Sequence, residues 1–170
     1  NQAFELNCQK YWDLHRWSVE KPAEFWRFYA DYAQIPFDQA PEEIISDDAM
    51  PLTRWFVGAS LNYARALLYP AGVQESDLAI IALTERGDEE RLSYADLRAE
   101  VALARQALVT SGVGEGDRVA AYLGNVSEAV ILFLACASLG AIFSSGSPDF
   151  GFETALARFG QIEPLILVAS

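Results

Sequence analysis

Residues 117–151, DRVAAYLGNVSEAVILFLACASLGAIFSSGSPDFG, decide the fold of this chain. They predict a strand over 118–123, a helix over 126–139 that is apolar nearly all round, and a second strand over 141–144. Gly140 can end the helix in a left-handed conformation. A strand, a crossover helix and a strand this close together form a right-handed βαβ unit with a parallel sheet. Since a parallel sheet is covered on both faces, the rest of the chain is expected to supply that cover.

Composition bounds the class of protein. The chain has 170 residues, 52% hydrophobic and 12% aromatic, which is enough for one domain with a real core. Its net charge of −12 argues against nucleic acid and anionic membranes as partners. The most apolar stretch, 130–143, is shorter than the roughly 20 residues of a membrane span, so core is expected there. Cys8 and Cys136 lie far apart without metal-ligand spacing, which fits a reducing, cytoplasmic setting and no metal site.

The two ends of the chain predict a fragment. The first residue is Asn1 rather than Met, and the last, Ser170, directly follows the apolar run 165–169. That run is typical of a core strand, and a domain rarely stops on one without a tail. The remainder of the same polypeptide is therefore expected as a partner of this segment.

The region before the βαβ unit divides into an arm and the start of a larger body. Residues 1–57 hold all four tryptophans and are expected to form an aromatic arm, with 58–170 as the incomplete following domain. Pro22 predicts the first turn of a helix, with Ser18 as one possible cap, and Gln34–Pro36 ends it. Residues 37–51 are expected to be an extended connector.

The body contains further elements in sequence order. We expect a short helix over 60–68, then a hairpin of strands 78–84 and 90–92 joined by a turn over 85–88. Ser93 and Asp96 form a capping-box pattern before an amphipathic helix that Gly112 closes. The glycines at 112, 114 and 116 follow a helix and precede a strand, so they are turn glycines rather than a dinucleotide fingerprint. A helix over 153–159, closed by Gly160, and a strand over 165–169 complete the chain.

The loop 144–151, SSGSPDFG, is the one candidate ligand site. It follows a predicted parallel strand at the carboxyl edge, where ligands of open α/β sheets bind, and it is small, polar and glycine-containing. The alternative is an ordinary capped loop in which Ser147 or Asp149 starts the next helix. His15, the single histidine, shares no segment with a nucleophile and is expected to be structural.

Several blocks together resemble the AMP-forming acyl-CoA synthetases and related adenylating enzymes. These are LSYADLR at 92–98, GDRVAAYL at 116–123, with its upstream Gly112, NVSEAV at 125–130, and ASLGAI at 137–142. Within that superfamily the acetoacetyl-CoA synthetases are most similar. The blocks for that likeness are LHRWSV at 14–19 with Phe25–Trp26, RWFVGA at 54–59 with LNYA at 61–64, the loop 144–151, and RFGQIEP at 158–164. Val57, Arg65–Ala66 and Gly146 depart from the usual pattern, which leaves a sister substrate specificity open.

The resemblance implies a fold and a reaction. The fold is α/β: a partial N-terminal subdomain of the adenylating-enzyme large domain, with a mostly parallel sheet, βαβ units and an aromatic helical arm. The parent would be an acid–thiol ligase that uses ATP, Mg and CoA to convert acetoacetate into its thioester through an acyl-adenylate. The phosphate-binding loop, magnesium site and catalytic lysines lie later in that family's chain. This segment alone is therefore expected to be inactive and to bind none of these cofactors tightly.

The same resemblance supplies the candidate site residues. In related acetyl-CoA synthetases, the loop equivalent to Ser147, Pro148, Asp149 and Phe150 lies near the CoA nucleotide. Two alternatives remain open from the residues. The parent could activate another short-chain acid, such as acetate or propionate, or the chain could be a self-contained flavodoxin-like binding module whose aromatic arm docks a partner.

Overall fold

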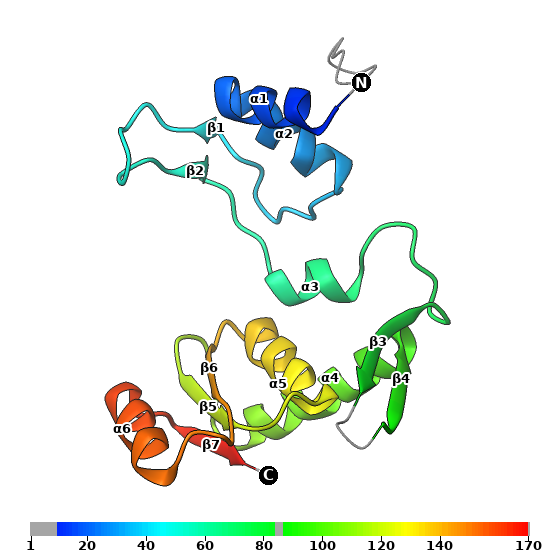
Figure 1. The fold of residues 1–170 in the computed structure, drawn as a ribbon, viewed down its shortest axis with the longest axis vertical. Helices are drawn as coiled ribbons and strands as arrows, with labels where there is room; N and C mark the ends of the chain where they lie inside the picture. Colours follow the sequence, from blue (N-terminus) through cyan, green and yellow to red (C-terminus); the bar gives the residue numbers. More distant parts are fainter. Residues whose placement is uncertain (1–9, 84–86, 170) are drawn as a thin grey trace. The chain divides into compact units, whose positions relative to one another are not determined.

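The computed structural model describes residues 10–83 and 87–169. The chain divides into two compact units, one ending at Leu61 and the other beginning at Asn62 (Figure 1). The first unit contains α1 (Tyr11–Glu20), α2 (Pro22–Tyr32) and a two-stranded antiparallel sheet of β1 (Glu43–Ile45) and β2 (Trp55–Val57).

The first unit has more regular structure than the sequence predicts. Helix α2 starts at Pro22 as expected, but Lys21 is its N-cap, so the assignment of Ser18 as the cap was wrong. Ser18 lies inside α1, where its hydroxyl donates to the His15 carbonyl oxygen at 2.7 Å. Because Trp17 is buried against the edges of two rings of α2, Phe25 at 5.3 Å and Phe28 at 5.6 Å, a tertiary aromatic cluster stabilises α1.

Strand pairing also replaces part of the predicted connector. Residues 37–51 were expected to be an extended connector, and within them β1 pairs with β2 in the register Glu43–Val57 and Ile45–Trp55. Ile44 is buried, which gives this short strand an apolar anchor. Strands of three residues carry too little alternation for sequence analysis to identify them.

The second unit is built on a parallel sheet. Its strands are β5 (Arg118–Tyr122), β6 (Ile142–Gly146) and β7 (Ile166–Ala169), in the order β6-β5-β7, and all are parallel. Helix α5 (Ser127–Ser138) connects the first two, and α6 (Phe152–Ile162) connects β6 to β7. The predicted βαβ unit is confirmed, and Gly140 adopts φ +70° after α5 as expected.

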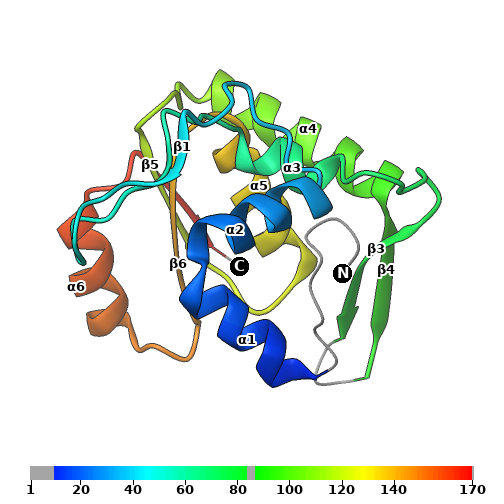
Figure 2. The same cartoon turned by 90° about the horizontal axis from the view of Figure 1, so that it is seen from above.

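Strand order explains where the helices lie. The chain moves from β5 to β6 in one direction, then crosses back over β5 to reach β7. Because crossovers between parallel strands are right-handed as a rule, the two connecting helices are expected to cover opposite faces of the sheet. Figures 1 and 2 show α5 and α6 on opposite sides of the strands. This reversal is the topological arrangement that creates a ligand-binding crevice in doubly wound sheets.

The remaining elements of the second unit cover the α5 side. They are α3 (Tyr63–Leu68), the antiparallel pair β3 (Leu78–Leu83) and β4 (Glu89–Ser93), and α4 (Tyr94–Thr110). The hairpin prediction is confirmed for these strands; residues 84–86 of its predicted turn lie outside the described residues, and Gly87 has φ +86°. Helix α4 starts with the predicted capping box of Ser93 and Asp96.

The core lies between the sheet and α5. Val119 and Ala121 of β5 and Ala135 and Cys136 of α5 are fully buried, and the small residues allow close approach of helix and strand. Burial raises the pKa of the Cys136 thiol to about 11, so it is held protonated as a small apolar group.

The last helix is longer than predicted. The sequence indicated a stop at Gly160, but α6 continues through it to Ile162. Glycine within a helix costs roughly 1 kcal/mol, and the half-buried Ile162 lies in the turn that α6 gains beyond Gly160. Glu163 then ends the helix with φ +45°.

Candidate functional site

Residues 147–150 leave the sheet at its carboxyl edge. They directly follow β6, and the parallel register places Tyr122 of β5 opposite Gly146 at the same edge. Ala169 of β7 pairs with the other side of Tyr122. Because ligands of open α/β sheets bind outside the carboxyl ends of the strands, the loop lies where the sequence predicted it.

The loop is closed by its own hydrogen bonds. Ser147 Oγ donates to Asp149 Oδ2 at 2.8 Å, and the Asp149 backbone N–H donates back to Ser147 Oγ at 3.3 Å. The Phe150 N–H donates to the Ser147 carbonyl oxygen at 3.1 Å. Pro148 and Asp149 are exposed, whereas Ser147 and Phe150 are half-buried. The turn thus presents one carboxylate to solvent in a defined position.

Neither loop side chain caps the following helix. The sequence alternative made Ser147 or Asp149 the start of that helix, but α6 begins at Phe152 with Gly151 as its N-cap. No side chain caps this N-terminus. Ser147 and Asp149 bond to each other instead, which makes this a turn with its own structure.

Two residues that sequence analysis did not identify as site residues, Tyr122 of β5 and Arg158 of α6, contact the loop. The Tyr122 hydroxyl donates to the Pro148 carbonyl oxygen at 2.8 Å and also lies within hydrogen-bond distance of the Phe150 carbonyl. The Arg158 guanidinium lies over the Phe150 ring, 4.3 Å from its centroid. In the sequence, Tyr122 stood only as a residue of the strand predicted over 118–123, and Arg158 as a residue of the helix predicted over 153–159.

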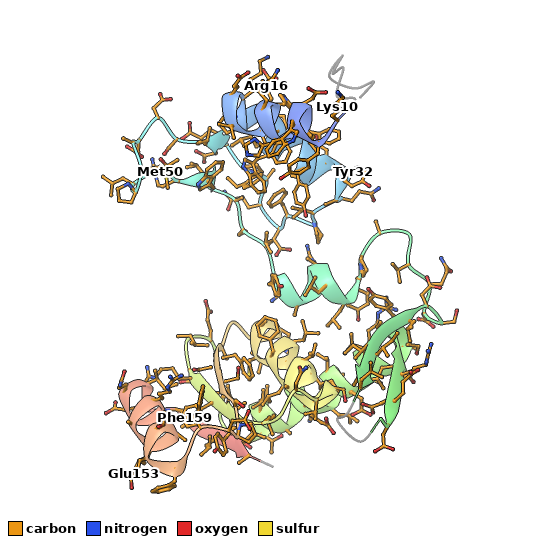
Figure 3. The ribbon with its side chains drawn as sticks, in the orientation of Figure 1. Lys10, Arg16, Tyr32, Met50, Glu153 and Phe159 are labelled. Carbon is orange, nitrogen blue, oxygen red and sulfur yellow. The ribbon has the colours of Figure 1, made fainter. Side chains whose placement is uncertain are left out.

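The end of β6 and helix α6 approach each other closely next to the loop. A Cβ at Gly146 would lie 3.1 Å from Phe159 Cζ and 3.7 Å from Phe150 Cδ2. The Phe159 ring meets Tyr122 edge-on, with centroids 6.3 Å apart. Figure 3 shows Phe159 on the side of α6 that faces the strands, and Glu153 on its outer side. Gly146 therefore leaves the space in which the ring of Phe159 packs.

The chemistry of the loop suits binding. It combines a carboxylate, a hydroxyl and an aromatic ring, and the Arg158 guanidinium of α6 lies over that ring; carboxylate and hydroxyl groups can hydrogen-bond a polar ligand. Among residues 10–83 and 87–169, no three His, Cys, Asp or Glu side chains form a group that could hold a metal ion. The two lysines, Lys10 and Lys21, both belong to the first unit.

His15 lies on α1 with its side chain exposed, and the structural role that its sequence context indicated stays a prediction. Its ring lies 5.7 Å from the Trp12 centroid and 6.2 Å from that of Tyr11, all three on α1.

Two apolar hollows flank the carboxyl edge of the sheet. One groove of about 620 Å³ lies on the α4 and α5 side and includes Leu123 and Val168. A smaller hollow of about 260 Å³ lies between α6 and the strands and includes Tyr122, Phe159 and Leu167. Leu165 and Leu167 are more than half exposed, so apolar side chains lie on the surface beside β7. None of the helices that the structure describes is both long and apolar enough to cross a bilayer.

Comparison with known proteins divides the chain between two family models. The model described as "AMP-binding enzyme" matches residues 69–169, and the model described as "Acetyl-coenzyme A synthetase N-terminus" matches residues 11–66.

Curated relatives match across almost the whole chain. The "Acetoacetyl-CoA synthetase" of Macaca fascicularis is 41% identical over 169 residues, which is 97% of this chain and 25% of that protein. The "Malonamoyl-CoA synthetase vrtB" of Penicillium aethiopicum is 36% identical over 98% of this chain and 24% of its own length. The chain thus spans about a quarter of the length of these relatives.

A solved structure matches the fold. The "Acetoacetyl-CoA Synthetase from Streptomyces lividans" superposes with a TM-score of 0.86 and 37% sequence identity. The match covers 94% of this chain and 25% of that one.

Proposed function

The chain belongs to the family of AMP-binding enzymes, and from this premise we propose that it is the amino-terminal quarter of an acid–thiol ligase acting on acetoacetate. The observation that carries the proposal is the combined likeness to acetoacetyl-CoA synthetases, at 41% identity over 97% of the chain and a TM-score of 0.86. As domains of that parent, we propose residues 1–57 as its aromatic arm and 58–170 as the start of its adenylation domain.

The proposed reaction has two steps. The carboxylate oxygen of acetoacetate attacks the α-phosphorus of ATP, and pyrophosphate leaves with the formation of acetoacetyl-AMP. The thiol of CoA, losing its proton, then attacks the acyl carbon, and AMP leaves to give the thioester. Magnesium supplies charge neutralisation at the phosphates when bound.

The described residues have a supporting part in this reaction. The sheet β6-β5-β7 and α5 provide a rigid base, and the loop 147–150 is placed on it at the carboxyl edge. We assign the CoA side of the site to Ser147, Pro148, Asp149 and Phe150. The phosphate-binding loop, the magnesium site and the catalytic lysines are assigned to the part of the parent beyond residue 170, so this segment alone is inactive. The cytoplasmic location stays a prediction from cysteine usage.

A second acid is a real alternative. The Penicillium relative is named for a different acid, malonamoyl, yet its identity of 36% is close to that of the acetoacetyl-CoA synthetases. The match to an acetyl-coenzyme A synthetase model likewise keeps acetate and propionate open. We assign none of the described residues to the acid pocket, so the choice of acetoacetate depends on the relatives alone.

The test is ATP–pyrophosphate exchange by the product of the complete gene, with magnesium. Acetoacetate is compared with acetate, propionate, 3-hydroxybutyrate and malonamate. Exchange strongest with acetoacetate supports the proposal. Exchange strongest with another acid keeps the ligase and corrects the substrate. A folded protein that exchanges with none of them contradicts the ligase and favours the self-contained binding module.

The loop assignment has its own test in the same protein. Asp149→Ala is expected to raise the KM for CoA while pyrophosphate exchange, which needs no CoA, continues at the wild-type rate. An unchanged KM for CoA would remove these four residues from the CoA side.

A further inference from the structure

We propose that Tyr122 is a positioning residue for CoA, acting through the backbone of the loop 147–150; the inference depends on the proposed CoA role of that loop. Tyr122 is the last residue of β5, and the loop follows the neighbouring strand β6. The two loop carbonyl groups that its hydroxyl reaches belong to Pro148 and Phe150, which lie 26 and 28 residues further along the chain. The hydroxyl therefore connects the rigid centre of the sheet to the loop.

The first argument is the convergence of two carbonyl groups. The Pro148 oxygen is 2.8 Å from the Tyr122 hydroxyl oxygen, and the Phe150 oxygen is also within hydrogen-bond distance. A phenol has one hydroxyl proton, so Tyr122 donates to one carbonyl oxygen at a time and can alternate between the two. Two carbonyl oxygens that point at one spot repel each other unless a donor lies between them. The hydroxyl supplies that donor, so the curled form of the loop depends on it.

The second argument is the rigidity of the group that makes the contact. Tyr122 belongs to the central strand of the sheet, paired with Gly146 on one side and Ala169 on the other. Its ring packs edge-on against Phe159 of α6. Because the backbone of Tyr122 is paired within the sheet and its ring packs against Phe159, its hydroxyl has a defined position. The hydrogen bonds from this hydroxyl then fix the position of the loop relative to the strand.

The third argument concerns the atoms left for a ligand. With its carbonyls turned toward Tyr122, the loop keeps Asp149 exposed, and the Ser147–Asp149 hydrogen bond orients the carboxylate. Arg158 lies against the Phe150 ring and holds the end of the turn. A ligand that contacts Asp149 thus meets a preformed surface, and removing the hydroxyl would make the ligand order the loop when it binds.

The experiment uses the complete gene product and the variant Tyr122→Phe, which removes only the hydroxyl and keeps the ring against Phe159. The expected result is a roughly three- to tenfold increase in the KM for CoA, the ratio that corresponds to loss of one hydrogen bond. Pyrophosphate exchange without CoA is expected to stay within roughly twofold of wild type. Tyr63→Phe is the matched control, because Tyr63 of α3 contacts Phe133 through its ring, and its KM for CoA should not change.

The comparison with Asp149→Ala separates the two levels of the proposal. An increased KM for CoA in both Tyr122→Phe and Asp149→Ala supports the inference. An increase in Asp149→Ala alone overturns the positioning role of Tyr122 and leaves the loop on the CoA side. An increase in neither overturns both assignments, while exchange by the wild type still upholds the ligase. Equal loss of exchange and thioester formation in Tyr122→Phe, with a lowered melting temperature, overturns the inference by showing a purely structural role.

Discussion

Single side chains decide how the helices of the second unit begin and how they are held. Arg98 of α4 donates from Nε to the Leu68 carbonyl oxygen at 2.9 Å, which ties the end of α3 to α4. Its guanidinium also lies 4.5 Å from the Tyr69 ring centroid. A planar guanidinium can make both contacts at once, whereas an ammonium group cannot reproduce them.

We therefore expect Arg98→Lys to destabilise the 170-residue chain by about 1–2 kcal/mol despite keeping the charge. Arg105→Lys on the exposed side of the same helix is the matched control and should change the free energy of unfolding by less than about 0.5 kcal/mol. Urea denaturation followed by circular dichroism measures both. Equal effects of the two variants would show that Arg98 acts only as a surface charge.

The capping box predicts a pH dependence. The hydroxyl and backbone N–H of Ser93 both donate to Asp96 Oδ2, and these hydrogen bonds lower the pKa of that carboxyl group. Because the folded pKa is depressed, the contribution to stability is present at neutral pH and is lost as the pH falls below about 4. The stability difference between wild type and Asp96→Asn should therefore be larger at pH 7 than at pH 3. Thermal melts at both pH values test this, and a difference independent of pH would contradict it.

At the scale of elements, α5 shows why an apolar helix must be central. Leu134 and Cys136 face the core and are almost fully buried, while Val130 stays partly exposed. The sequence shows apolar residues on every side of this helix, so it predicts burial but does not distinguish the faces. The packing of α3, α4 and the strand β6 against α5 makes that distinction.

We expect Leu134→Ala to destabilise the chain by about 2–5 kcal/mol, because it leaves a cavity between α5 and its neighbours. Leu103→Ala, on the exposed face of α4, removes the same atoms where no cavity can form and should cost less than about 0.5 kcal/mol. Chemical denaturation of both variants gives the comparison. Similar losses would mean that the two leucines are equally buried in solution.

At the scale of the whole molecule, the second unit carries apolar surface that the described residues do not cover. On α6, Phe152 and Leu156 are exposed, and Leu165 and Leu167 beside it are more than half exposed. Strand β7 is an edge strand of the sheet, and bare apolar edges promote association. Under the proposed function, the rest of the parent enzyme would cover these surfaces.

The 170-residue chain by itself is therefore expected to bind the dye ANS and to associate at rising concentration, and the double variant Phe152→Gln/Leu156→Glu to do so less. Val109→Glu, an exposed apolar residue at the far end of α4, is the control and should leave association unchanged. Sedimentation velocity and dye fluorescence provide the measurements. A chain that stays monomeric and binds no dye would contradict the expected exposure.

Local signals explain which parts of the fold the sequence predicts. The strand–helix–strand order of 117–151, the capping box and the hairpin β3–β4 all depend on residues within a few positions of one another. The same applies to the placement of the loop 147–150 at the carboxyl edge, since it directly follows a strand. Helix α1 and the pairing of β1 with β2 were missed because a buried tryptophan and a distant partner strand stabilise them.

The sequence by itself determined that this chain is an α/β segment with a βαβ unit and a loop at the edge of its sheet, because hydrophobic periodicity and turn residues act locally. Only the tertiary structure decided that β7 lies beside β5 rather than β6, and that Tyr122 reaches the loop that follows the next strand. The physical reason is that these contacts join residues far apart in the chain, and their geometry exists only after both crossovers have packed on the sheet.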